Sequence, residues 1–189
     1  TRAEHVRDEL GDAVRVVLDG GECQIGLEST IVACDNDGVR VLRPGAVTVA
    51  QIREVVGDRL IESSTLEAPR VPGSTPSHYA PRTPLELVSG DRLDAAVRGQ
   101  GLPAGRIALV AYGEPPAALD GRVSWHAVPA DPARYAQVLY ALLRELDAQR
   151  YARILVQAPP QDAAWAAVND RIGRAAAAFS LDTEGLPGT

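Results

Sequence analysis

The chain has 189 residues, 46% of them hydrophobic, so it can bury one large core or two smaller ones. Its net charge is −6 and all 19 basic residues are arginine, which argues against nucleic-acid binding through bulk positive charge. Because no signal-peptide pattern and no apolar run of about 18 residues occurs, we expect a cytoplasmic protein with no membrane contact.

The N-terminal third predicts a helix, a strand and a hairpin. A capping box, Thr-x-x-Glu from Thr1, predicts the start of the helix, and Gly11 predicts its end. Residues 14–18 are apolar and rich in valine, which is typical of a strand. Residues 26–45 are predicted to form two short strands joined by an Asp-Asn-Asp-Gly turn at 35–38.

A second capping box and a proline-rich segment follow the hairpin. Thr48, with Gln51 three residues later, predicts the start of a helix that ends at Gly57. Residues 65–82 contain four prolines, which disfavour a helix or a central strand. We therefore expect an extended, semi-rigid linker there.

From residue 83 onward, predicted strands alternate with predicted helices. The strands are expected at 85–88, 106–111, 123–128 and 153–157, and the helices at 91–98, after Asp131 and after Asp162. This alternation predicts a parallel, Rossmann-like α/β sheet. No GxGxxG motif follows a strand, so we assign no chemistry to this part of the chain. Arg171 and Arg174 are interpreted as solvated surface residues, and His126 as a packed or edge residue rather than a catalyst.

Two segments carry residues that packing alone does not require. Ser29 and Arg43 lie on the two arms of the hairpin, where a hydroxyl and a guanidinium could hold an anionic ligand. His78 and Tyr79 lie in the linker, where an aromatic pair could close over a planar ligand. The alternative is that Tyr79 only anchors the linker to one domain.

Three motifs occur in a recognisable order: Gly-Leu-Glu-Ser-Thr-Ile-Val at 26–32, Leu-Arg-Pro-Gly-Ala at 42–46, and His-Tyr-Ala-Pro at 78–81. Together they resemble the Sua5/YrdC family, the L-threonylcarbamoyladenylate synthases, and residues 153–160 are similar to the family's C-terminal Sua5 domain. The resemblance implies an α/β protein with three parts. They are the C-terminal portion of a YrdC-type catalytic domain (1–64), a proline-rich interdomain linker (65–82) and a Rossmann-like Sua5 domain (83–189).

The resemblance also implies a reaction and its substrates. Members join L-threonine, bicarbonate or CO2, and ATP into threonylcarbamoyl-AMP, with release of pyrophosphate, for the t6A modification of tRNA. Ser29 would contact L-threonine, whereas Arg43, His78 and Tyr79 would contact ATP. Mg2+ is expected on the phosphates, and downstream tRNA-modification proteins are expected as partners. No residue is assigned as catalytic or as a metal ligand.

The chain departs from the family pattern in two places. The family's upstream Lys-x-Arg and Ser-Ala-Asn segments do not occur in it. We therefore expect the C-terminal part of a longer protein, and no synthase activity from these 189 residues alone. Residues 75–77 are Thr-Pro-Ser, where many members have Lys-Tyr-Arg, so a basic contact to phosphate is lost.

Three alternatives remain open. The first is a relative that forms carbamoyl-AMP and transfers its carbamoyl group. The second is a non-catalytic RNA-binding or regulatory module, although residues 1–64 carry 12 acidic and only 7 basic side chains. The third is a Rossmann-like domain that binds an unknown small ligand.

Overall fold

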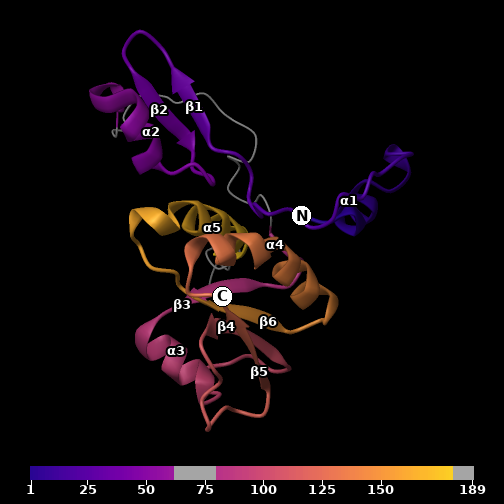
Figure 1. Ribbon diagram of the computed structural model, residues 1–189. Helices are drawn as coiled ribbons and strands as arrows, with labels where there is room; N and C mark the ends of the chain where they lie inside the picture. The colour runs from indigo at the N-terminus through magenta and orange to yellow at the C-terminus, as the bar shows by residue number, and fades with distance from the viewer. Residues whose placement is uncertain (62–79, 181–189) are drawn as a thin grey trace, which may run out of the picture.

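The computed structural model describes residues 1–61 and 80–180, which form a small N-terminal unit and a larger C-terminal domain (Figure 1). The N-terminal unit contains α1 (Ala3–Leu10), β1 (Ile31–Cys34), β2 (Val39–Arg43) and α2 (Val49–Val56), with 3-10 helices at Gly11–Ala13 and Gly57–Arg59. The C-terminal domain contains β3 (Leu85–Val88), α3 (Gly90–Val97), β4 (Ile107–Tyr112), β5 (Val123–Val128), α4 (Pro132–Ala148), β6 (Arg153–Gln157), a 3-10 helix (Ala163–Trp165) and α5 (Ala166–Ser180).

The C-terminal domain is built on a parallel sheet with the strand order β3-β6-β4-β5. The central strands β4 and β6 are apolar almost throughout and buried, as expected for strands that are covered on both faces. This arrangement confirms the α/β fold class and the predicted Rossmann-like parallel sheet.

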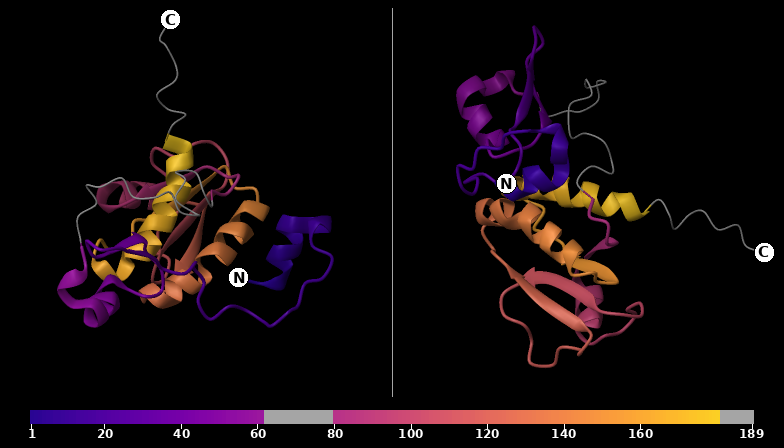
Figure 2. Two further views of the ribbon diagram at one scale, coloured as in Figure 1. Left: turned by 90° about the horizontal axis from the view of Figure 1, so that it is seen from above. Right: turned by 90° about the vertical axis from the view of Figure 1, so that its right-hand side faces the viewer.

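Helices cover both faces of this sheet. One core lies between the sheet and α3, and includes Ala96, Leu109 and Leu155. The other core lies between the sheet and helices α4 and α5, and includes Leu139 and Ile172. Figure 2 shows α4 and α5 as a layer between the sheet and the N-terminal unit. The N-terminal unit therefore contacts the outer side of these two helices.

Two helix starts in the C-terminal domain, those at Asp131 and Asp162, follow the capping signals in the sequence. Asp131 Oδ1 accepts a hydrogen bond of 2.8 Å from the backbone N–H of Arg134, with Pro132 in the first turn of α4. Asp162 Oδ1 accepts one of 2.9 Å from Ala164 N at the 3-10 helix that leads into α5. Among the described helices, none is long and apolar enough to cross a membrane.

The N-terminal unit contains the predicted hairpin. Strands β1 and β2 pair antiparallel, with Ile31 opposite Arg43. In the turn, Asp35 Oδ1 accepts a hydrogen bond of 3.0 Å from Gly38 N. Helix α2 begins with the full capping box of Thr48 and Gln51, as predicted.

Two predictions for the N-terminal unit are wrong. Arg2, not Thr1, occupies the N-cap position of α1, and the Thr1 hydroxyl instead lies 3.3 Å from His5 Nδ1. Residues 14–18 form no strand, and both Val16 and Leu18 are exposed. Within the described residues no other strand lies beside this segment, and a strand needs a hydrogen-bonded neighbour.

Candidate functional site at the hairpin and its junction with the C-terminal domain

The structure brings Ser29 and Arg43 together at the open end of the hairpin. Arg43 is the last residue of β2 and is only 6% exposed, whereas Ser29 lies just before β1 and is exposed. Arg43 donates two hydrogen bonds to the Ser29 carbonyl oxygen, from Nε at 3.2 Å and from Nη2 at 2.8 Å. The guanidinium therefore fixes the backbone that carries the Ser29 hydroxyl.

The adjacent hydroxyls of Ser29 and Thr30 have different surroundings. Thr30 Oγ1 donates a hydrogen bond of 2.7 Å to the Val47 carbonyl oxygen, which ties the first arm of the hairpin to the chain after the second. Ser29 is the exposed member of the pair. Of the two, Ser29 is thus better placed to meet a ligand.

Gly45 explains part of the Arg-Pro-Gly motif. A Cβ built at Gly45 would lie 2.6 Å from the Glu28 carbonyl oxygen and 2.7 Å from the Ser29 carbonyl carbon. Both are backbone atoms, which cannot swing away as a flexible side chain can. Only glycine therefore allows the two motif segments to approach this closely.

Glu28, directly before Ser29, reaches across to the C-terminal domain. Its carboxylate accepts hydrogen bonds from Tyr140 Oη on α4, at 3.1 and 3.0 Å from the two oxygens. It also accepts a hydrogen bond of 2.7 Å from Arg171 Nε on α5. Arg171 Nη2 donates to the Pro44 carbonyl oxygen at 3.1 Å.

The surface prediction is wrong for Arg171, whereas Arg174 is partly exposed. Arg171 is 1% exposed, and it also pairs with Asp170, which in turn pairs with the partly buried Arg174. Burial disfavours the charge of Arg171, but its hydrogen bond and ion pair with Glu28, together with the interactions with Tyr140 and Asp170, outweigh this, so the pKa of its guanidinium is raised. One signal was available in the sequence: Arg171 lies three residues after Val168 and directly before Ile172, both on the buried face of the helix.

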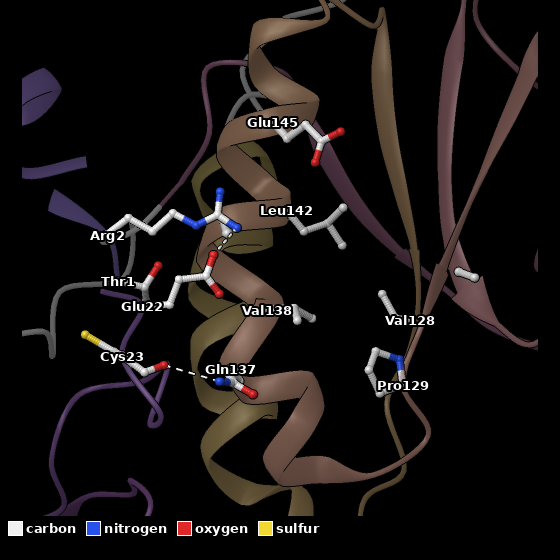
Figure 3. A pocket seen from close by; sticks show the side chains of 12 residues that line it. Thr1, Arg2, Glu22, Cys23, Val128, Pro129, Gln137, Val138, Leu142 and Glu145 are labelled. Atoms are coloured by element: carbon white, nitrogen blue, oxygen red, sulfur yellow. Dashed lines mark hydrogen bonds and ion pairs between the residues drawn. The ribbon is translucent and has the colours of Figure 1, made fainter. Parts of the chain in front are cut away.

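A separate cleft of about 480 Å³ lies between the N-terminal segment and α4 (Figure 3). Val128, Pro129, Val138 and Leu142 line its apolar part. Its polar lining includes an ion pair of 2.5 Å between Arg2 and Glu22, together with Gln137 and Glu145. Neither Ser29 nor Arg43 lines this cleft.

His78, Tyr79 and His126 are the other residues that the sequence analysis considered. His78 and Tyr79 lie outside the described residues, so their predicted contacts with a nucleotide remain predictions. His126 is half-buried, with Nε2 3.1 Å from the Tyr151 hydroxyl, and burial lowers its pKa. In residues 1–61 and 80–180, no group of three or more His, Cys, Asp or Glu side chains is arranged to hold a metal ion.

Comparison with protein families gives two matches along the chain. Residues 47–177 match the family described as "Threonylcarbamoyl-AMP synthase, C-terminal domain". Residues 1–45 match the Sua5/YciO/YrdC family, which is described as "Telomere recombination".

Individual relatives agree with these family matches. The threonylcarbamoyl-AMP synthase of Bacillus subtilis is 30% identical over 182 residues, which cover 93% of this chain and 53% of the relative. That of Schizosaccharomyces pombe is 27% identical, over 93% of this chain and 48% of the relative. The crystal structure of Sua5 from Pyrococcus abyssi in complex with L-threonine superposes with a TM-score of 0.72 at 23% identity, over 95% of this chain and 54% of that one. The chain thus spans about half the length of the proteins that it matches.

Proposed function

The chain belongs to the Sua5 family of threonylcarbamoyl-AMP synthases, and from this premise we propose that it forms part of an enzyme that makes threonylcarbamoyl-AMP. The substrates would be L-threonine, bicarbonate or CO2, and ATP. The threonine amine would be carboxylated to a carbamate, with loss of water when bicarbonate is the donor. A carbamate oxygen would then attack the α-phosphorus of ATP, and pyrophosphate would leave.

The arrangement of Ser29 and Arg43 is the observation that carries this proposal. The exposed Ser29 hydroxyl would contact L-threonine, and the positive charge of Arg43 would favour the phosphates of ATP. Arg43 would have a second role as well, because its bonds to the Ser29 carbonyl orient the threonine contact. His78 and Tyr79 would complete the nucleotide site from the linker.

Catalysis in such a site would rest on positioning and on charge stabilisation. Holding the carbamate and the α-phosphate in line lowers the activation barrier, because the entropy of bringing the two reactants together is lost on binding and not in the chemical step. Mg2+ would arrive with ATP on its phosphates and neutralise the developing negative charge. No residue of this chain is assigned a role in proton transfer.

The chemistry of the product suggests a further partner. Threonylcarbamoyl-AMP is a mixed anhydride, so it must be passed to an enzyme that transfers the threonylcarbamoyl group to tRNA. We propose a cytoplasmic enzyme that supplies the t6A modification.

The test is L-threonine-dependent release of pyrophosphate from ATP by the complete protein. We expect Ser29→Ala to raise the KM for threonine. Arg43→Gln should raise the KM for ATP and, because Ser29 loses the hydrogen bonds that hold its carbonyl, the KM for threonine as well. Thr48→Ala, which changes a hydroxyl that caps α2, is the control and should leave both values unchanged. Pyrophosphate release that requires carbamoyl phosphate rather than threonine would instead favour a carbamoyl-AMP-forming relative, and no release with either would contradict the proposal.

A further inference from the structure

The side chain of Arg171 joins the C-terminal domain to both motif segments of the hairpin. It is 0% exposed, although it ends in a charged guanidinium. Nε bonds to Glu28, the residue before Ser29, and Nη2 bonds to Pro44, the residue after Arg43. One planar fork thus holds the neighbours of both proposed substrate contacts.

The contacts of this side chain require an arginine rather than a lysine. The two bonds leave different nitrogens of a rigid plane, at 2.7 Å and 3.1 Å. Its third nitrogen, Nη1, pairs with Asp170, which fixes the fork from its own helix. A lysine ammonium is a compact point charge and cannot reach these positions with the same spacing.

The segment 26–28 is held against the C-terminal domain by three further kinds of contact. A Cβ at Gly26 would lie 2.5 Å from the Gln137 carbonyl oxygen, so the backbone lies directly on α4. Leu27 belongs to the hydrophobic core between the sheet and helices α4 and α5. Tyr140 Oη donates to the Glu28 carboxylate from α4. Ser29 therefore follows a segment that is fixed by two helices of the other domain.

We propose that Arg171 is a positioning residue for the substrate site, through which the C-terminal domain sets the relative placement of Ser29 and Arg43. This proposal rests on the proposed function for what the site binds, but the junction itself rests only on the contacts above. It gives the C-terminal domain a direct role in the geometry of the substrate site.

The experiment uses the complete protein and compares variants that separate positioning from stability. Arg171→Met removes the fork and keeps an apolar stem, Arg171→Lys keeps the charge, and Tyr140→Phe removes one hydroxyl. The control is Leu109→Ala, which opens a cavity in the core on the opposite, α3-facing side of the sheet. Leu109 contributes to stability but makes no contact of the junction described above.

Two measurements are made on each variant, below its unfolding temperature. The first is steady-state kinetics, which gives kcat and the KM values for threonine and ATP. The second is amide hydrogen exchange of peptides that cover residues 27–45. We expect Arg171→Met to lower kcat/KM about 10- to 100-fold, mainly by raising KM. A small displacement of the residues that bind the substrates has effects of this size. Exchange in residues 27–45 should rise, with Arg171→Lys intermediate and Tyr140→Phe mildest.

Leu109→Ala should lower the unfolding temperature and leave KM and the exchange of residues 27–45 at wild-type values. Wild-type KM and exchange in Arg171→Met would overturn the proposal, as would equal changes in Leu109→Ala. If the wild-type protein shows no threonine-dependent pyrophosphate release, the proposed function fails, and the exchange measurement alone still decides whether Arg171 orders the hairpin. If Arg171→Met does not fold, Arg171→Lys and Tyr140→Phe provide the same comparison.

Discussion

Gly45 shows how a single residue sets the geometry of the candidate site. It lies where the second motif segment crosses the backbone of Glu28 and Ser29, and any side chain there would collide with main-chain atoms. The glycine therefore determines how close Arg43 can come to the Ser29 carbonyl, and so how the two proposed ligand contacts are spaced.

We expect Gly45→Ala to lower the free energy of unfolding by about 1–3 kcal/mol, the usual cost of an added methyl group where the structure cannot relax. Urea denaturation would measure this loss. Gly20→Ala is the matched control, because nothing lies within 4 Å of a Cβ at Gly20, and it should be neutral or slightly stabilising. Equal stability of the two variants would mean that the two motif segments separate at little cost.

The sequence singled out Ser29 and Arg43 by residue type and by position on a hairpin, and their contacts with substrates stay predictions. It could not show that Arg43 bonds to the Ser29 carbonyl, because a backbone acceptor leaves no mark in the sequence. The burial of Arg171 was missed for a similar reason: its main partner, Glu28, precedes it by 143 residues.

Among the elements, the two capping boxes show how context decides whether a local signal is used. Both fit the Thr/Ser-x-x-Glu/Gln pattern, yet only Thr48 caps its helix, through reciprocal bonds with Gln51. Thr1 lies one residue before the actual N-cap of α1. The strand predicted at 14–18 failed in a comparable way, since valine-rich composition favours a strand but does not supply a neighbouring one.

The two threonines allow a matched comparison. We expect Thr48→Ala to cost about 1 kcal/mol of stability, because the N–H of Gln51 loses its acceptor. Thr1→Ala should change stability by less than about 0.5 kcal/mol, as an ordinary surface substitution does. Thermal unfolding followed by circular dichroism would measure both, and a larger loss for Thr1→Ala would contradict the helix boundaries described here.

At the scale of the whole molecule, the sequence predicted the layers of the C-terminal domain but not how the N-terminal unit joins it. Alternating apolar strands and capped helices were sufficient for a parallel sheet, because both signals are local. The strand order β3-β6-β4-β5 and the placement of the hairpin on α4 and α5 depend on contacts between distant residues. The domain boundaries at 64 and 82 likewise stay predictions, since residues 62–79 lie outside the described part of the chain.

Leu27 tests whether the hairpin is a structural part of the C-terminal domain. It is 8% exposed and packs in the core between the sheet and helices α4 and α5. We expect Leu27→Ala to lower the stability of that domain by about 2–5 kcal/mol. Fluorescence of Trp125 and Trp165, both in the C-terminal domain, would report this loss during urea unfolding.

Leu60 provides the matched control for this measurement. It is also 8% exposed, but it lies beside Val39 in the N-terminal unit and outside the core that contains Leu27. Leu60→Ala should therefore shift the tryptophan-reported transition less than Leu27→Ala does. An unchanged transition in Leu27→Ala would show that the stability of the C-terminal domain does not depend on this contact with the hairpin.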